Sequence, residues 1–255
     1  MTLFDVPGHQ APAAPASAPE DRASSAVVRM VVAYDGTDFH GFAAQRDQRT
    51  VAGELHGALT KVLRTEALEL ACAGRTDAGV HAWGQVVSFS APRDVDLDRL
   101  RTSLNAMLGP EIVVRAADRV GDDFDARHSA RRRSYRYTIV NRPEPDPFLA
   151  RYAWHVPTPL DLAALRLGAD PFVGEHDFSS SCRKGPEGST TMRRVTHSSW
   201  HDLGDGLLRY DIRANAFCWQ MVRSVVGTLI EVGAGKKRPG DILTIVRAHD
   251  RAAAG

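Results

Sequence analysis

Residues 207–214 read LLRYDIRA, and their alternation decides the fold class. Leu208, Tyr210 and Ile212 alternate with charged side chains, so a strand here carries one apolar face and one polar face. A strand that helices cover on both sides is apolar on both faces, which argues against a doubly wound parallel sheet. The segment therefore predicts an α+β fold with mainly antiparallel sheets.

Strand-like and helix-like segments alternate along the rest of the chain. Apolar and alternating patterns predict strands over 27–33, 85–90, 111–120 and 134–140, and helical spacing predicts helices over 51–62, 97–108, 160–167 and 217–232. Thr50 is placed to cap the first helix, and Gly233 and Gly235 to end the last. The order restarts near residues 122–129, which predicts α+β halves over 26–122 and 123–255 after a disordered Ala/Pro-rich tail at 1–25.

The bulk composition is that of a folded globular protein. Of the 255 residues, 43% are hydrophobic and 25% charged, and the net charge is only +1, so any attraction to nucleic acid must come from local clusters. No apolar run approaches the roughly 20 residues of a membrane span, and the N-terminus lacks a secretory signal. Cys72, Cys182 and Cys218 are far apart and odd in number, which predicts neither a disulfide framework nor a zinc site and fits a cytoplasmic protein.

One such cluster lies at residues 124–142, FDARHSARRRSYRYTIVNR. It contains six arginines against a single acid, Asp125, and two tyrosines stand among them. Arginines beside aromatic rings suit contacts with phosphate and stacking with bases. A solvated basic linker followed by core tyrosines would have the same composition, and these residues alone leave both readings open.

The loop at residues 73–84, AGRTDAGVHAWG, places Asp77 between an arginine and two glycines. Gly74 and Gly79 permit a tight turn that projects its side chains outward, so Asp77 is a candidate reactive carboxylate. An ordinary turn with a capping aspartate explains the same residues, and on the loop alone it is favoured. His81 lies four residues after Asp77, but no third ligand accompanies it, so the spacing does not predict a metal site.

Five ordered blocks together resemble the TruA-type tRNA pseudouridine synthases. They are YDGTDFHGF (34–42), GRTDAGVHAWGQVVSF (74–89), FDARHSARRRSYRYTIVN (124–141), GEHDFSSSC (174–182) and NAFCWQMVRSVVGTLIEVGAG (215–235). The resemblance implies two ferredoxin-like or RNA-recognition-like halves whose sheets meet around a central cleft. It also implies a homodimer that converts uridine to pseudouridine at positions 38, 39 and 40 of the tRNA anticodon stem-loop, without cofactor or metal.

The same resemblance implies a role for each matching residue. Asp77 matches the catalytic nucleophile, Arg223 its basic partner, and Tyr135 the tyrosine that packs against the uracil ring. Arg75 matches the arginine that assists flipping of the base, which costs a few kcal/mol of lost stacking. The phosphate contacts are expected from Arg127, Arg131 and Arg132, and such contacts weaken steeply with salt.

The chain departs from the family pattern at a few places. Ala43 and Gln220 replace a common Gln and a common His, and the chain ends at HDRAAAG, where the family continues into a last strand. The expectation is therefore that the C-terminal half lacks its final strand. The alternative to an enzyme is a catalytically silent RNA-binding module that keeps the arginine and tyrosine face.

Overall fold

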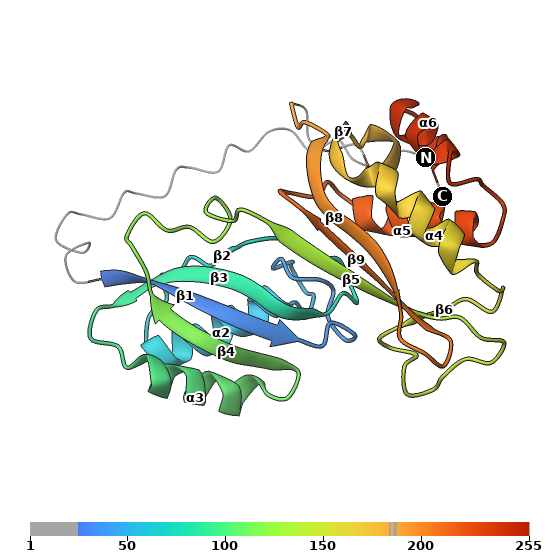
Figure 1. The fold of residues 1–255 in the computed structure, drawn as a ribbon. Coiled ribbons are helices and arrows are strands. Elements are labelled where there is room, and N and C mark those ends of the chain that lie inside the picture. The colour runs from blue at the N-terminus through green and yellow to red at the C-terminus, as the bar shows by residue number, and fades with distance from the viewer. Residues whose placement is uncertain (1–24, 184, 186–187, 255) are drawn as a thin grey trace, which may run out of the picture.

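The computed structural model describes residues 25–183, 185 and 188–254, and in it the chain forms two β-sheets with helices packed on them (Figure 1). The first sheet has four strands in the order β2-β3-β1-β4. The second has five, in the order β6-β5-β9-β8-β7. This mixed arrangement confirms the predicted α+β class.

Every strand pair in the first sheet is antiparallel. The strands are β1 (Ser25–Tyr34), β2 (Ala71–Cys72), β3 (Ala82–Pro92) and β4 (Ile112–Arg119). Alternate residues of β1 are buried, among them Val28, Met30 and Val32, because helices α2 (Val51–Leu63) and α3 (Leu97–Leu108) cover only one face. These residues and the inner faces of the two helices form one hydrophobic core.

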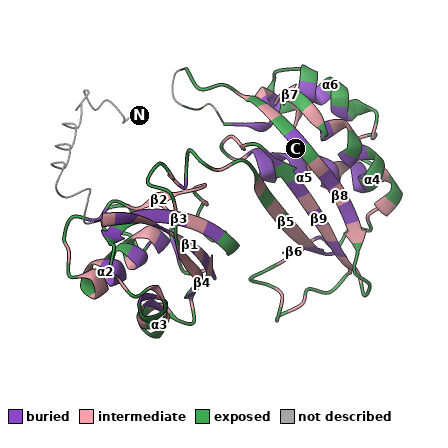
Figure 2. Cartoon of the chain, turned by 60° about the vertical axis from the view of Figure 1, so that its left-hand side comes forward, coloured by how far each residue is buried: buried purple, intermediate pink, exposed green. Residues whose placement is uncertain are grey.

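The second sheet is antiparallel except where β5 and β6 run parallel. Its strands are β5 (Arg133–Val140), β6 (Trp154–His155), β7 (Gly174–Asp177), β8 (Met192–Asp202) and β9 (Leu207–Ala214). The helices are α4 (Leu162–Ala169), α5 (Met221–Gly233) and α6 (Asp241–Arg247), with the 3-10 turns η1 (Asp170–Phe172), η2 (Ser179–Ser181) and η3 (Arg251–Ala253). A second hydrophobic core, separate from the first, lies between this sheet and its helices (Figure 2).

Two of the predicted helices are displaced. The helix predicted over 217–232 begins at Met221, because Gln220 adopts a left-handed backbone with φ 62° and so cannot continue a helix. The helix predicted over 160–167 begins at Leu162, where Asp161 caps it by accepting hydrogen bonds from the amides of Ala163 and Ala164. The long strand β8 was not predicted.

The chain crosses from the first sheet to the second between Arg119 and Arg133, a stretch that contains the predicted junction at 122–129. The division of the chain into domains at that junction stays a prediction. The predicted tail lies outside the described residues except for Ser25, where β1 begins. In the described part of the chain, no helix has both the length and the hydropathy needed to cross a bilayer.

Candidate active site

The loop that carries Asp77 joins β2 to β3 and rests on residues 34–42. The amide of Phe42 donates to the carbonyl of Thr76 over 3.0 Å, and the amide of Gly79 donates to the carbonyl of Phe39 over 3.3 Å. The Tyr34 hydroxyl lies 2.8 Å from the Thr76 hydroxyl. These contacts hold the loop on both sides of Asp77, so the block YDGTDFHGF supports the loop.

Two glycines of this supporting segment allow the backbone of the Asp77 loop to approach it closely. A Cβ on Gly36 would lie 2.1 Å from the carbonyl oxygen of Val80, and a Cβ on Gly41 would lie 2.8 Å from that of Thr76. Gly41 also has φ +93°, which side chains disfavour. The two positions require glycine because the backbone of the Asp77 loop occupies the space of a side chain.

Asp77 is exposed, and it lies close enough to Tyr135 and Tyr137 of the second sheet for its charge to act on both. Burial raises the pKa of Tyr135 and Tyr137, and the Asp77 carboxylate adds to both shifts. The charge of Arg223, the third residue of α5, acts on Tyr137 in the opposite direction. The fold therefore brings Asp77, both tyrosines and Arg223 into one electrostatic neighbourhood, although among the described residues no ion pair joins Asp77 to Arg223.

An aromatic wall completes this neighbourhood. The ring of Tyr135 meets that of Phe217 edge to face, with centroids 5.0 Å apart. Tyr135 and Tyr137 pair across the sheet with the fully buried Ile212 and Tyr210, so their rings belong to the face that packs on α5. Such a wall can pack against the face of a nucleobase.

Three arginines gather near Cys72, at the start of the Asp77 loop. Burial raises the pKa of the Cys72 thiol, and the charges of Arg75, Arg127 and Arg133 oppose that rise, so three guanidinium groups gather near this residue. Arg75 and Arg127 are exposed. Arg131 and Arg132 are exposed too, and within residues 25–183, 185 and 188–254 neither side chain has a hydrogen-bond or ion-pair partner. These four side chains are available to contact phosphate.

Comparison with known proteins identifies the family of this chain. A family model described as tRNA pseudouridine synthase matches residues 30–129 and 169–255. The chain belongs to the tRNA pseudouridine synthase family. It is 44% identical to tRNA pseudouridine synthase A of Brevibacillus brevis over 228 residues, which cover 89% of this chain and 93% of the relative. The corresponding protein of Leifsonia xyli subsp. xyli is 42% identical over 247 residues, covering 89% of this chain and 85% of the relative.

Membership makes this chain an enzyme, an isomerase that modifies tRNA. Sequence reasoning assigned no individual role to Tyr34, Gly41, Arg133 or Tyr137, although each lies close to the Asp77 loop or acts on the same neighbourhood. The block at 34–42 resembles the family pattern, but no local pattern shows that it supports a loop more than 30 residues away. Only the tertiary contacts assign that task to it.

The end of the loop in this synthase is tied to the second sheet's part of the chain. The Nε2 of His81 donates to the carbonyl of Arg151 over 2.9 Å, and the Tyr152 hydroxyl donates to Oδ2 of Asp35 over 2.8 Å. Burial alone would raise the pKa of Asp35, but hydrogen bonds from Thr37 and Tyr152 and the nearby His81 lower it to about 2. Asp35 is thus held as a carboxylate at the contact.

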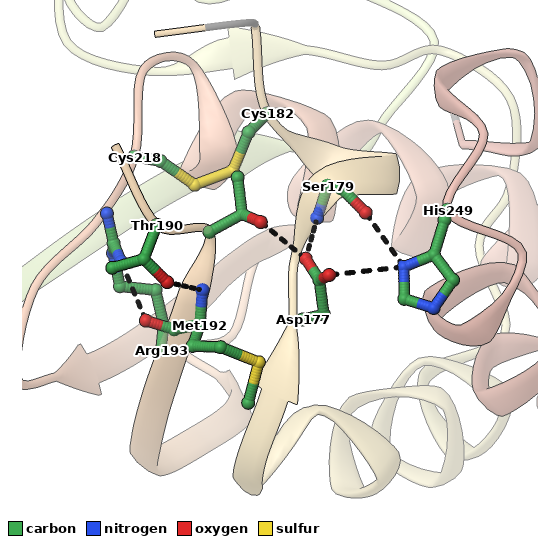
Figure 3. The surroundings of a disulfide bond; sticks show 9 residues. Asp177, Ser179, Cys182, Thr190, Met192, Arg193, Cys218 and His249 are labelled. Atoms are coloured by element: carbon green, nitrogen blue, oxygen red, sulfur yellow. Dashed lines mark hydrogen bonds and ion pairs between the residues drawn. A yellow bond between two sulfur atoms is a disulfide. The ribbon is translucent and has the colours of Figure 1, made fainter. Parts of the chain in front are cut away.

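A disulfide corrects the expectation that the cysteines are unpaired. Cys182, at the end of η2, is bonded to Cys218, which precedes α5, and their Cα atoms are 5.8 Å apart (Figure 3). The neighbouring backbone amide of Arg183 donates to the carbonyl of Trp219 over 3.0 Å, so the two loops already lie side by side. A separation of 36 residues gave no sign of this proximity, because tertiary packing creates it.

Within the described residues, no group of three or more His, Cys, Asp or Glu side chains is arranged to hold a metal ion. His249 is close to Asp177 and Ser179, with its Nδ1 at 3.3 Å from Oδ2 of Asp177 and 3.0 Å from Oγ of Ser179 (Figure 3). This cluster is a local hydrogen-bonded contact between η2 and the C-terminal segment.

Proposed function

We propose that this synthase converts uridine to pseudouridine at positions 38, 39 and 40 of the tRNA anticodon stem-loop, with Asp77 as nucleophile. One observation carries the proposal. Asp77 stands on a loop held by residues 34–42, its charge acts on both Tyr135 and Tyr137, and the charge of Arg223 acts on Tyr137 as well.

The reaction is an isomerisation that needs no oxidant or reductant. The bond between ribose C1′ and uracil N1 breaks, the base turns, and a bond forms between C1′ and C5. The hydrogen on C5 leaves to water, and N1 gains a proton. An ionised carboxylate can add to the nucleoside and be released at the end of the cycle. A free aspartate has a pKa of about 3.9, so it is ionised at neutral pH.

For the remaining residues we propose the roles that the family resemblance implies. Tyr135, on the aromatic wall, packs against the uracil ring, and Arg223 supports the negative charge of the site. Arg75, two residues before Asp77, occupies space left by the flipped base, and Arg127, Arg131 and Arg132 contact phosphates. We further propose that the two α+β halves enclose the RNA in a cleft between them and that two copies of the chain form a homodimer.

The substitution Asp77→Asn tests the nucleophile. We expect it to abolish pseudouridine formation on an unmodified tRNA transcript while leaving tRNA affinity near the wild-type value. Asp38→Asn is the matched control, because Asp38 is an exposed aspartate of the neighbouring segment whose carboxylate pairs with Arg151 at 4.0 Å, away from the proposed reactive group. Turnover that survives in Asp77→Asn would remove Asp77 from this role.

The substrate positions are tested separately, with transcripts that carry cytidine in place of uridine at position 38, 39 or 40. Each replacement should remove one pseudouridine from the mapped product and leave the other two. Pseudouridine formed only elsewhere in the tRNA would contradict the proposed sites without affecting the assignment of Asp77.

A further inference from the structure

Arg133, the first residue of β5, does not point into solvent as a phosphate-binding arginine would. Its guanidinium donates to three backbone carbonyls: to Ala73 through Nε at 2.8 Å and Nη2 at 2.5 Å, to Asn215 through Nη1 at 2.8 Å, and to Arg127 through Nη2 at 3.4 Å. The side chain is half-buried. All of its observed hydrogen bonds are therefore made to the protein backbone.

The three carbonyls belong to segments that are far apart in sequence. Ala73 opens the loop that carries Asp77, and Asn215 opens the turn that leads into α5 and Arg223. Arg127 lies in the stretch that connects the two sheets. One planar group thus connects the loop of the nucleophile to the segment that positions its proposed basic partner.

The fit around this guanidinium is close. A Cβ on Gly74 would lie 3.4 Å from Nε and 3.6 Å from Cδ of Arg133, so the loop packs directly on the side chain. Arginine presents its donors in a rigid fork, whereas lysine has a single ammonium group on a flexible chain. A lysine here could not replace bonds that point in three directions at once.

The other end of the Asp77 loop is fixed in a comparable way. His81 donates to the carbonyl of Arg151, and the adjoining Asp35 accepts from Tyr152, so the loop is tied to the second sheet's part of the chain at its entrance and at its exit. Between these ties the reactive carboxylate has a defined position relative to Tyr135 and α5.

We infer that Arg133 is a positioning residue for the isomerisation: by bridging Ala73 and Asn215 it holds the Asp77 loop in register with the helix that carries Arg223. This separates it from Arg131 and Arg132, which have the same charge and precede it directly but lack partners among the described residues. The inference rests on the proposed role of Asp77. Misplacing a reacting group by about 1 Å can cost a factor of about 100 in rate.

The test compares Arg133→Gln with Arg136→Gln. Arg136 is on the same strand but pairs with Asp211 of its own sheet at 2.9 Å, which makes it the matched control. Turnover is followed by release of tritium from tRNA labelled at uridine C5, over a range of tRNA concentrations. We expect Arg133→Gln to lower kcat about 10- to 100-fold with KM within about twofold, and Arg136→Gln to leave both unchanged.

Amide hydrogen exchange gives a second measurement that activity alone does not. In Arg133→Gln, exchange should speed up at residues 73–81 and 215–220 and stay unchanged in α2 and α3. Arg133→Lys retains the charge but not the forked donors. We expect it to recover less than a tenth of the kcat that Arg133→Gln loses relative to the wild type. If Arg133→Gln fails to fold, Arg133→Lys alone decides whether Arg133 positions the loop or contacts phosphate. A phosphate contact would tolerate lysine, whereas the positioning role would not.

A raised KM with unchanged kcat and a weaker salt dependence of binding would overturn the inference in favour of a phosphate contact. Unchanged exchange at 73–81 would overturn it as well. Failure of the proposed function can be distinguished from failure of this inference. Turnover by Asp77→Asn would show that Asp77 is not the nucleophile, whereas the exchange measurement would still report whether Arg133 holds the loop.

Discussion

Substitution of Gly41 by alanine should displace the Asp77 loop without changing the chemical identity of any proposed reactive side chain. The added Cβ would lie 2.8 Å from the carbonyl oxygen of Thr76 and 3.3 Å from the carbonyl carbon of Asp77. Ordinary contact begins near 3.4 Å, so the carbonyl has to retreat by about 0.6 Å. The hydrogen bond from Phe42 to the same oxygen, now 3.0 Å, is stretched or lost with it.

Two costs follow, and they are separable. An alanine at φ +93° is strained by about 1 to 3 kcal/mol, which lowers the free energy of unfolding. The movement of the loop lowers kcat about 10- to 100-fold, because shifts on the ångström scale remove the alignment of reacting atoms. The first cost is measured by urea denaturation and the second by tritium release at saturating tRNA.

Gly204→Ala is the control for the first cost alone. Gly204 has φ +82° in the turn between β8 and β9, and a Cβ there would meet nothing within 4 Å. We expect a similar loss of stability and a wild-type kcat. A wild-type kcat in Gly41→Ala as well would refute the reasoning, since the loop would then not need the position that Gly41 allows.

Three further predictions concern the contacts that hold the fold. Because the pKa of Asp35 in the folded protein, about 2, lies below its ordinary 3.8, its carboxylate stabilises the fold above about pH 4, and this contribution disappears as the pH falls toward 2; Tyr152→Phe should raise that pKa in a carboxyl NMR titration. Reduction of the Cys182–Cys218 disulfide, which spans 36 residues, should cost about 3 to 4 kcal/mol, seen as a lower urea midpoint that Cys182→Ser reproduces without reductant. Thr50→Ala removes the hydroxyl that accepts from the amide of Gly53 over 3.2 Å and should cost about 1 kcal/mol in the same assay.

Elements with a strong local pattern were predicted well from the sequence. Helix α3 and strand β9 occupy the predicted residues, because each shows a clear apolar periodicity and clear ends. Strand β8 was missed because one of its three buried positions, Ser198, is polar and interrupts the apolar pattern. Ser198 is buried, yet its hydroxyl is satisfied by the carbonyl of Ala169 and the hydroxyl of Tyr210. Residue hydrophobicity cannot reveal a partner that only the folded sheet supplies.

Local reasoning and the family resemblance gave different interpretations of the Asp77 loop. The loop by itself favoured an ordinary turn at Asp77, because nothing within 73–84 shows that Tyr135 and α5 lie opposite. Asp77 and Arg223 both come close enough to Tyr137 to act on it only when the two sheets, each with its own core, have packed together. The same limit explains the disulfide, whose two cysteines become neighbours through η2 and the turn before α5.

The three consecutive arginines at 131–133 show where a local rule could have gone further. Side chains alternate between the faces of a strand, so Arg133 shares a face with Tyr135 and Tyr137, provided that the strand begins one residue before the predicted start at 134. The strand does begin there, and Arg133 pairs with Ala214 at the last position of β9. Its place beside the aromatic wall therefore follows from the alternation of side chains along a strand, once the strand is extended by one residue to include Arg133. The difference between Arg133 and Arg132 lies in register, since both have the same charge and the same side-chain chemistry.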